Sequence, residues 1–254
     1  MRTALNIICV TLLLLLTSCG GGGIECNYEL IAHAGGAIDG RIYTNSREAL
    51  ERALANGYRH IELDLALTSD STLVAAHSWQ LFNEISGFAH KGDTAPTLGE
   101  FLSRRIYGRY TPLTAKEINR FFLENEELIL VTDKISDAAI LEENFPTLKK
   151  RMIVEAFTHD DYVRLKEQGY HRVFYSCLAG DIDEAVVKHL LLHKIFGDKI
   201  EWMALHTSSV EYPLFKVIDA LCNYRAAIFT INDTAEIPRE LIKKVGYIYT
   251  DSIK

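Results

Sequence analysis

Short runs of aliphatic and β-branched residues alternate along most of the chain with longer amphipathic stretches. Eight runs have the length and composition of buried strands, at residues 30–33, 60–65, 128–132, 152–157, 172–177, 201–205, 226–231 and 247–250. The stretches between most of them place apolar residues three and four positions apart, which predicts helices. Strands separated by helices pair in parallel, so eight such units predict an α/β fold, a single closed (β/α)8 barrel.

Capping residues indicate where several of these helices begin. Asn45, Thr114 and Thr158 each stand before a helical pattern. Segment 78–111, after the second strand, follows no regular pattern and is expected to be an insertion. A doubly wound open sheet is the alternative fold, but the His-Ala-Gly-Gly turn at 33–36 is a poor match for the glycine-rich first turn of such sheets.

The first residues have the pattern of a targeting segment. One positive charge at Arg2 precedes an apolar stretch, 3–16, that is too short to span a bilayer comfortably. It ends in Leu-Thr-Ser-Cys at 16–19, followed by four glycines, and resembles a bacterial lipoprotein signal in which Cys19 becomes the acylated N-terminus. An ordinary signal peptide with a chance cysteine is the alternative.

This interpretation divides the chain into three parts. Residues 1–18 would be a lipoprotein signal peptide, 19–28 the lipidated cysteine with a glycine-rich tether, and 29–254 the barrel. We therefore expect a protein of the bacterial cell envelope, anchored by lipid to the periplasmic or surface face of a membrane.

Composition and charge narrow the function classes. Of 254 residues, 48% are hydrophobic and 24% charged, which excludes a disordered chain because this much apolar surface can form a core. The chain has 27 Lys and Arg against 34 Asp and Glu and no long basic run, so nucleic acid is not an expected partner. Its five cysteines do not form a CxxC metal motif.

Polar residues with chemical capability gather where the predicted strands end. In a (β/α)8 barrel these ends form one mouth, where active sites lie. The mouth would hold three carboxylates, two imidazoles and one ammonium: Glu62, Asp64, Asp133, His33, His77 and Lys134. Glu62 and Asp64 stand two apart on one strand, so both point to the same side.

These residue types suit metal-assisted cleavage of a phosphodiester. Three carboxylate oxygens suit a hard divalent cation, Ca²⁺ or Mg²⁺, rather than a zinc site built of His and Cys. Imidazoles titrate near neutral pH and suit proton transfer. A single Glu-x-Asp pair or strand-end histidine is more often structural, but the whole set at successive strand ends indicates a site.

Several motifs together resemble the glycerophosphodiester phosphodiesterase family. Residues 31–36 (Ile-Ala-His-Ala-Gly-Gly), Asn45-Ser46, 61–64 (Ile-Glu-Leu-Asp) and the apolar run ending in His77 resemble the family motifs HRG, ENT, IELDV and HD. Residues 229–233 (Phe-Thr-Ile-Asn-Asp) and 249–251 (Tyr-Thr-Asp) resemble its WTVND strand and closing TD. The resemblance covers about residues 29–254.

The resemblance implies a TIM barrel with catalytic histidines matching His33 and His77. It implies metal ligands matching Glu62 and Asp64, with a third carboxylate on strand 3, where the family usually carries Glu-x-Lys and this chain has Asp133-Lys134. It also implies attack by the glycerol 2-hydroxyl on phosphorus through a cyclic phosphate, with one histidine as base and the other as acid.

Departures from the family pattern bear on the substrate. The arginine after the first histidine is Ala34 here, which removes a bidentate phosphate donor, and Arg41 further along the loop is a candidate substitute. Ser78 replaces the family's aspartate after the second histidine, and Phe229 its tryptophan. Lys134 would face phosphate only where its strand has already ended, since neighbouring strand residues face opposite sides.

Two function classes follow from these residues. The first is a metal-dependent hydrolase of glycerophosphodiesters or related lipid-headgroup phosphodiesters, using one Ca²⁺ or Mg²⁺ ion and His/His acid–base catalysis. The second is a lipid-anchored, catalytically weak protein that binds phosphate or headgroups on the same barrel. Both histidines are kept, and a matched acid and base favours the hydrolase.

Overall fold

Eight parallel strands close into a barrel in the computed structural model, which describes residues 28–177, 200–212, 215–216, 219–220 and 223–252. The strands are β1 (Glu29–Ala32), β2 (His60–Leu67), β4 (Ile129–Asp133), β5 (Met152–Ala156), β6 (Arg172–Cys177), β7 (Trp202–His206), β8 (Arg225–Phe229) and β9 (Val245–Thr250). Each pairs in parallel with its neighbour, and β1 pairs with both β2 and β9, which closes the ring. The predicted α/β fold, a (β/α)8 barrel, is confirmed.

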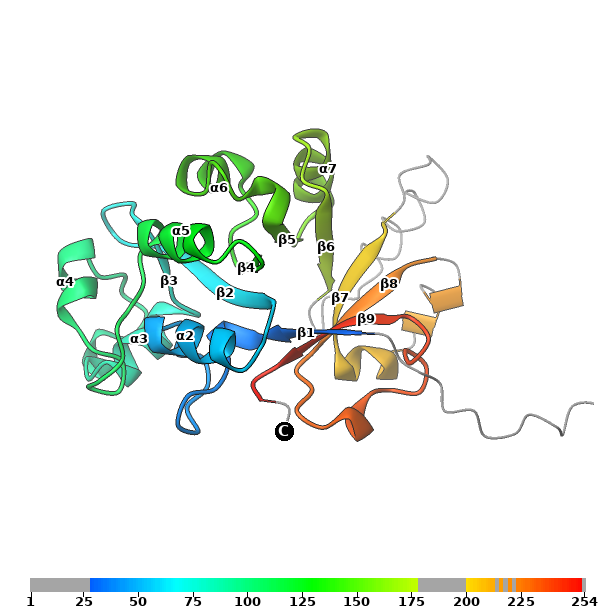
Figure 1. Cartoon of the computed structure of the whole chain (residues 1–254), viewed down its shortest axis with the longest axis horizontal. Helices are drawn as coiled ribbons and strands as arrows, with labels where there is room; N and C mark the ends of the chain where they lie inside the picture. The colour runs from blue at the N-terminus through cyan, green and yellow to red at the C-terminus, as the bar shows by residue number, and fades with distance from the viewer. Residues whose placement is uncertain (1–27, 178–199, 213–214, 217–218, 221–222, 253–254) are drawn as a thin grey trace, which may run out of the picture.

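Helices cover the outside of the strands (Figure 1). They are α2 (Arg47–Ala55), α3 (Trp79–Ile85), α4 (Leu98–Ser103), α5 (Ala115–Glu124), α6 (Ala138–Asn144) and α7 (His159–Glu167). Short 3-10 turns are η1 (His33–Gly35), η2 (Ala89–Lys91), η3 (Lys149–Arg151), η4 (Thr207–Glu211) and η5 (Thr234–Glu236). No helix in the described part of the chain has the length and apolarity needed to cross a bilayer.

Two of the three predicted helix N-caps agree with the structure, and the N-cap of α2 does not. Thr114 and Thr158 cap α5 and α7 as their sequences indicate, each accepting a hydrogen bond from a backbone N–H in the first turn. Helix α2 begins one residue later than expected: Ser46 is its cap and accepts from the Ala49 N–H. Asn45 is not free to cap, because its side chain binds Asp64.

The predicted insertion after the second strand is an ordered subdomain. It follows β3 (Leu73–Ala75), which pairs antiparallel with the end of β2, and contains α3, η2 and α4. Phe82 of α3 stacks on Phe101 of α4 with ring centroids 4.7 Å apart. This separate small core holds the loop that carries His77 against the barrel.

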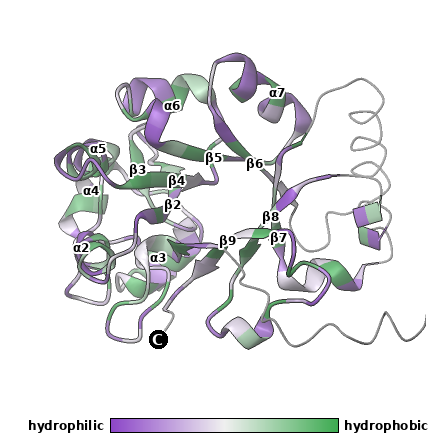
Figure 2. Ribbon diagram, turned by 45° about the vertical axis from the view of Figure 1, so that its right-hand side comes forward, coloured by the Kyte–Doolittle hydropathy of each residue, from purple (hydrophilic) through white to green (hydrophobic). Residues whose placement is uncertain are grey.

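The core has two layers that alternate along each strand. Ile61, Leu63 and Leu65 of β2 face outward into the layer between strands and helices. Inside the barrel, apolar side chains such as Ile31, Val131 and Ile153 fill the interior. Apolar residues dominate several strands, including β3 and β8, whereas α5 and α7 carry many hydrophilic ones (Figure 2). Glu62 and Asp64 therefore point inward, opposite to their apolar neighbours.

Candidate active site

A cavity of about 390 Å³ opens at the mouth of the barrel, where the strands end. Six residues predicted from the sequence line it: His33, Glu62, Asp64, His77, Asp133 and Lys134. A larger hollow of about 580 Å³ lies beside β1 and α2, but it holds no comparable cluster of acidic ligands. The chemistry is therefore concentrated in the smaller cavity.

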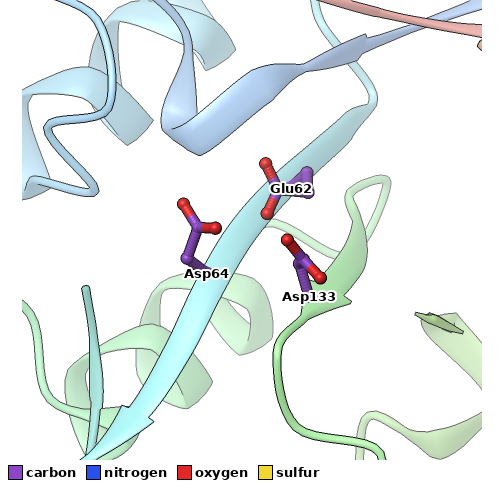
Figure 3. A group of neighbouring side chains, drawn as sticks. All are labelled: Glu62, Asp64 and Asp133. Atoms are coloured by element: carbon purple, nitrogen blue, oxygen red, sulfur yellow. The ribbon is translucent and has the colours of Figure 1, made fainter. Parts of the chain in front are cut away.

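Three carboxylates converge at the floor of this cavity. Asp64 of β2 lies directly opposite Asp133 of β4 in the parallel pairing, and Glu62 lies two residues before Asp64. One oxygen from each of the three side chains lies within 4.8 Å of the others (Figure 3). Glu62 and Asp64 are each 1% exposed, so solvent hardly reduces their mutual repulsion.

Burial is the largest cause that raises the pKa of Glu62, followed by the charges of Asp64 and Asp133. The pKa of Asp64 is raised for the same reasons, burial first and the charge of Asp133 second. Acids this close together can all be ionised only if positive charge lies near them.

The cluster has the properties of a cation site. Glu62 Oε2 accepts a hydrogen bond of 2.6 Å from the Ala34 N–H, whereas Glu62 Oε1 is buried and has no hydrogen-bond partner among the described residues. An unpartnered carboxylate oxygen facing two other carboxylates is what a hard divalent ion would satisfy. The residues present thus fit one such ion.

Asn45 fixes the orientation of Asp64. Its Nδ2 donates to Asp64 Oδ2 at 2.9 Å, and its Oδ1 accepts from the Asp64 backbone N–H at 3.0 Å. Asn45 has a φ of 47°, in the left-handed region that asparagine tolerates better than most residues. Both contacts leave Asp64 Oδ1 directed to the cation site.

Lys134 reaches the site because β4 ends at Asp133. Its φ of 71° turns the chain out of the strand, so Lys134 and Asp133 do not face opposite sides. The Lys134 Nζ lies 2.7 Å from Asp133 Oδ2 and 3.8 Å from Asp64 Oδ1. Burial lowers the pKa of Lys134, but the charges of Asp133, Asp64 and Glu62 outweigh it and hold that pKa well above its usual value.

His33 contacts a carboxylate from the last strand–loop junction. Its Nδ1 lies 3.1 Å from Asp251 Oδ1 and 3.3 Å from the Thr230 hydroxyl. The Asn232 amide donates to the other Asp251 oxygen at 3.0 Å. Burial raises the pKa of Asp251, but the hydrogen bonds from His33 and Asn232 and the charge of His33 outweigh it, and the pKa is lowered.

His77 lines the same cavity as His33 and also contacts Tyr43. Its Nδ1 is buried and has no hydrogen-bond partner among the described residues. The Tyr43 ring contacts both imidazoles edge-on, with centroids 4.8 Å from each. The two histidines thus line one cavity and contact the same aromatic ring.

One predicted site residue, Arg41, lies away from this cavity. The Arg41 guanidinium lies over the Tyr107 ring, 4.5 Å from its centroid, beside a different hollow formed with the insertion. The structure does not bring Arg41 into the cavity of the histidines. Cys19 lies outside the described residues.

A family model decides the identity of this barrel. The model described as the glycerophosphoryl diester phosphodiesterase family matches residues 34–184, more than half of the chain. The chain belongs to this family. Its members cleave phosphodiesters, so the protein is a phosphoric diester hydrolase.

Solved structures share the fold of this phosphodiesterase. A glycerophosphodiester phosphodiesterase from Parabacteroides distasonis has a TM-score of 0.62 at 24% identity, covering 89% of this chain and 93% of that chain. A phosphodiesterase from Oleispira antarctica, in complex with the product sn-glycerol-3-phosphate, has a TM-score of 0.59 at 18% identity, covering 88% and 92%. A structure from Agrobacterium tumefaciens has a TM-score of 0.66 at 15% identity, covering 88% and 93%. No curated protein matches the chain.

The departures from the family pattern have local explanations in this phosphodiesterase. Ser78, in place of the family's aspartate, caps α3 and accepts from the Leu81 N–H at 3.2 Å. Phe229 lines the cavity and keeps an apolar wall there. Ala34 is fully buried and contributes its backbone N–H to Glu62.

Sequence reasoning did not assign a role in the site to Tyr43, Tyr249 or Asp251. Tyr43 and Tyr249 line the cavity, and Asp251 contacts His33. Asp251 was visible as part of the closing Tyr-Thr-Asp motif, but its distance of 218 positions from His33 concealed the contact. Glu155, which the sequence placed within a strand, lines the cavity with His206.

Proposed function

We propose that this phosphodiesterase hydrolyses glycerophosphodiesters or related lipid-headgroup phosphodiesters with one bound divalent cation, His33 as general base and His77 as general acid. The observation that supports it best is the convergence of three carboxylates and two imidazoles on one cavity. The glycerol 3-phosphate bound to the structurally similar Oleispira antarctica phosphodiesterase supports a substrate with this moiety.

Glu62, Asp64 and Asp133 would hold the cation, Ca²⁺ or Mg²⁺. When bound, it supplies positive charge that stabilises the phosphoryl oxygens and lowers the pKa of a bound hydroxyl. Lys134, 2.7 Å from Asp133, adds a second positive charge at the same edge and binds a phosphoryl oxygen.

The contacts of the two histidines differ, and the difference supports their roles. With its proton on Nδ1, His33 donates to Asp251 and keeps Nε2 as the basic nitrogen, the arrangement of an oriented general base. His33 removes the proton of the glycerol 2-hydroxyl, whose oxygen attacks phosphorus and forms a cyclic phosphate. His77, which contacts no carboxylate through Nδ1, donates a proton to the departing alkoxide. Water then opens the cyclic phosphate with the roles reversed.

Two substrates separate the roles of the histidines. Glycerophosphocholine has a poor leaving group, whereas the p-nitrophenyl ester of glycerol 3-phosphate keeps the 2-hydroxyl and releases nitrophenolate, which hardly needs protonation. His33→Ala is expected to lower turnover of both by about 10²–10⁴-fold. His77→Ala is expected to lower turnover of glycerophosphocholine by a similar factor and that of the nitrophenyl ester far less.

The assay also tests the competing function. Activity in Ca²⁺ or Mg²⁺ that EDTA abolishes is the expected wild-type result. Wild-type binding of glycerol 3-phosphate without hydrolysis of either ester would instead support a catalytically weak binding protein. Equal turnover by wild type and both histidine variants would contradict the acid–base assignment.

We propose further that Cys19 is acylated and anchors the barrel to a membrane of the bacterial envelope. The sequence motif at 16–19 supports this, and it lies outside the described residues. Cys19→Ser is expected to release the protein from the membrane fraction or to leave an uncleaved precursor. Membrane association that persists with cleavage at another position would contradict acylation.

A further inference from the structure

The Tyr43 ring contacts both histidines. It lies 4.8 Å from the His33 ring at an interplanar angle of 76°, and 4.8 Å from the His77 ring at 68°. Both are edge contacts, an arrangement that aromatic rings favour. One tyrosine ring therefore packs against both imidazoles.

The backbone holds Tyr43 in this place at a conformational cost. Its φ is 57°, a left-handed value that is rare for a bulky side chain. Asn45, two positions after Tyr43, is fixed by hydrogen bonds to Asp64 and by its own N–H, which donates to the Ala34 carbonyl at 3.1 Å. Strained residues that are over-determined by their surroundings cluster at functional sites.

The phenol is a free donor in an anionic cavity. Tyr43 is half-buried, lines the cavity, and makes no hydrogen bond to any described residue. Burial first, and then the charges of Asp251, Asp64 and Glu62, raise the pKa of Tyr43, so the hydroxyl stays protonated at neutral pH. These carboxylates raise the pKa of Tyr43 because they lie close to its phenol, where the Coulomb interaction is strong.

The site lacks the arginine that the family carries after its first histidine. Position 34 holds alanine and no arginine, and Arg41 lies over Tyr107 outside the cavity. Lys134, which follows β4, contacts the carboxylates Asp133 and Asp64. A neutral donor beside the histidines would fill the missing contact.

We propose that Tyr43 contacts the substrate: its hydroxyl donates a hydrogen bond to a non-bridging phosphoryl oxygen, while its ring sets the separation of His33 and His77. This inference rests on the proposed function, because it assumes that a phosphodiester of glycerol binds in the cavity. It assigns Tyr43 a part of the role that the arginine after the first histidine has elsewhere in the family.

Tyr43→Phe isolates the hydroxyl, since the ring and its contacts remain. The variant is expected to bind sn-glycerol 3-phosphate about tenfold more weakly in titration calorimetry with Ca²⁺, because a hydrogen bond to a charged group is lost. Its kcat/KM for glycerophosphocholine is expected to fall by a similar factor or more, with an unchanged melting temperature. Tyr107→Phe is the matched control: Tyr107 also has a positive φ, 51°, but lies under Arg41 outside the cavity.

Tyr43→Leu tests the ring. Without the aromatic spacer, kcat is expected to fall at least tenfold below that of Tyr43→Phe, and the pH–rate profile to change because the histidines no longer keep their separation. Calcium-induced thermal stabilisation shows whether the variant still folds and binds metal. A Leu variant that folds and matches the Phe variant in kcat and pH profile would overturn the spacer role.

The calorimetric arm separates this inference from the proposed function. If wild type binds glycerol 3-phosphate but hydrolyses no ester, the hydrolase proposal fails and the Phe variant still decides the hydroxyl's role. Equal affinity of wild type and Tyr43→Phe overturns the phosphoryl contact. A wild type that neither binds nor hydrolyses overturns both proposals.

Discussion

A fourth carboxyl group, Glu155, lines the same cavity as the proposed cation ligands and has a different environment from the other three. The Tyr249 hydroxyl donates to Glu155 Oε1 at 2.5 Å, across the barrel from β9 to β5. Burial raises the pKa of Glu155 to about 8, the charge of Asp133 adds to this, and the Tyr249 hydrogen bond opposes it. At neutral pH Glu155 is therefore mostly protonated and adds little negative charge to the site.

Glu155→Gln should make folding stability less dependent on pH. The unfolded chain loses the Glu155 proton near its ordinary pKa of 4.5, whereas the folded protein keeps it until about pH 8. The contribution of Glu155 to the wild-type free energy of unfolding is therefore largest at low pH, and it declines by roughly 3–4 kcal/mol as the pH rises from 5 to 8. Glutamine keeps an oxygen for Tyr249 and cannot ionise.

Urea unfolding in EDTA at pH 5 and pH 8 measures this difference. The stability of Glu155→Gln relative to wild type is expected to increase between the two pH values. Glu51→Gln, on the exposed side of α2, controls for the loss of one carboxylate. Parallel pH profiles for wild type and Glu155→Gln would show that Glu155 is ionised in the folded protein.

At the scale of elements, the strands were predictable because each is a short apolar run between capping or turn residues. All eight predicted strands agree with the structure to within two residues at each end. Strand β3 was not predicted, because three residues carry too little periodicity and its pairing partner is the far end of β2. A contact distant in sequence also explains why Ser46, and not the predicted Asn45, caps α2: the Asn45 side chain is hydrogen-bonded to Asp64.

One glycine makes the packing of β9 against β7 and β8 possible. A Cβ on Gly246 would lie 2.7 Å from the Trp202 ring and from the Arg225 guanidinium. The Arg225 side chain could move, but the Trp202 ring packs against Tyr247, with centroids 4.9 Å apart, and against Phe174 at 5.4 Å. Trp202 therefore has little room to yield.

Gly246→Ala is expected to destabilise the barrel by about 1–3 kcal/mol, the usual cost of overpacking a core. Chemical denaturation of the two proteins measures it. Gly99→Ala is the control, because nothing lies within 4 Å of a Cβ on Gly99 in α4. That change is expected to be neutral or to stabilise by up to about 1 kcal/mol. Equal stability of Gly246→Ala and Gly99→Ala would mean that the Trp202 ring moves freely.

At the scale of the whole molecule, the site joins residues from both ends of the barrel sequence. Glu62, Asp64 and Asp133 could be placed together from the sequence, because strand alternation and the order of parallel strands fix their positions. The contact of Asp251 with His33 and the position of Tyr43 could not, since they depend on barrel closure and on a left-handed loop residue. Because residues from the beginning and the end of the barrel sequence meet at this site, cation binding is expected to stabilise the whole barrel against unfolding.

The acidic cluster should therefore couple metal binding to the stability of the entire barrel. Without a cation, Glu62, Asp64 and Asp133 repel one another in a buried place. An ion that binds only the folded protein stabilises it by about 2.7 kcal/mol at a concentration of 100 times Kd. Millimolar Ca²⁺ or Mg²⁺ is expected to raise the melting temperature of wild type above its value in EDTA.

Glu62→Gln should change which of the two proteins, variant or wild type, melts at the higher temperature, depending on whether metal is present. In EDTA the variant is expected to melt at or above the wild-type temperature, because the amide has no charge to repel Asp64 and Asp133. In Ca²⁺ or Mg²⁺ it is expected to melt below wild type, because one charged ligand is lost. Glu124→Gln, exposed at the end of α5, should follow wild type in both conditions. If metal raised the melting temperature of wild type and Glu62→Gln equally, the cation would bind elsewhere. If the variant melts at or above wild type in EDTA but below it in metal, this one carboxylate causes both the repulsion and the binding.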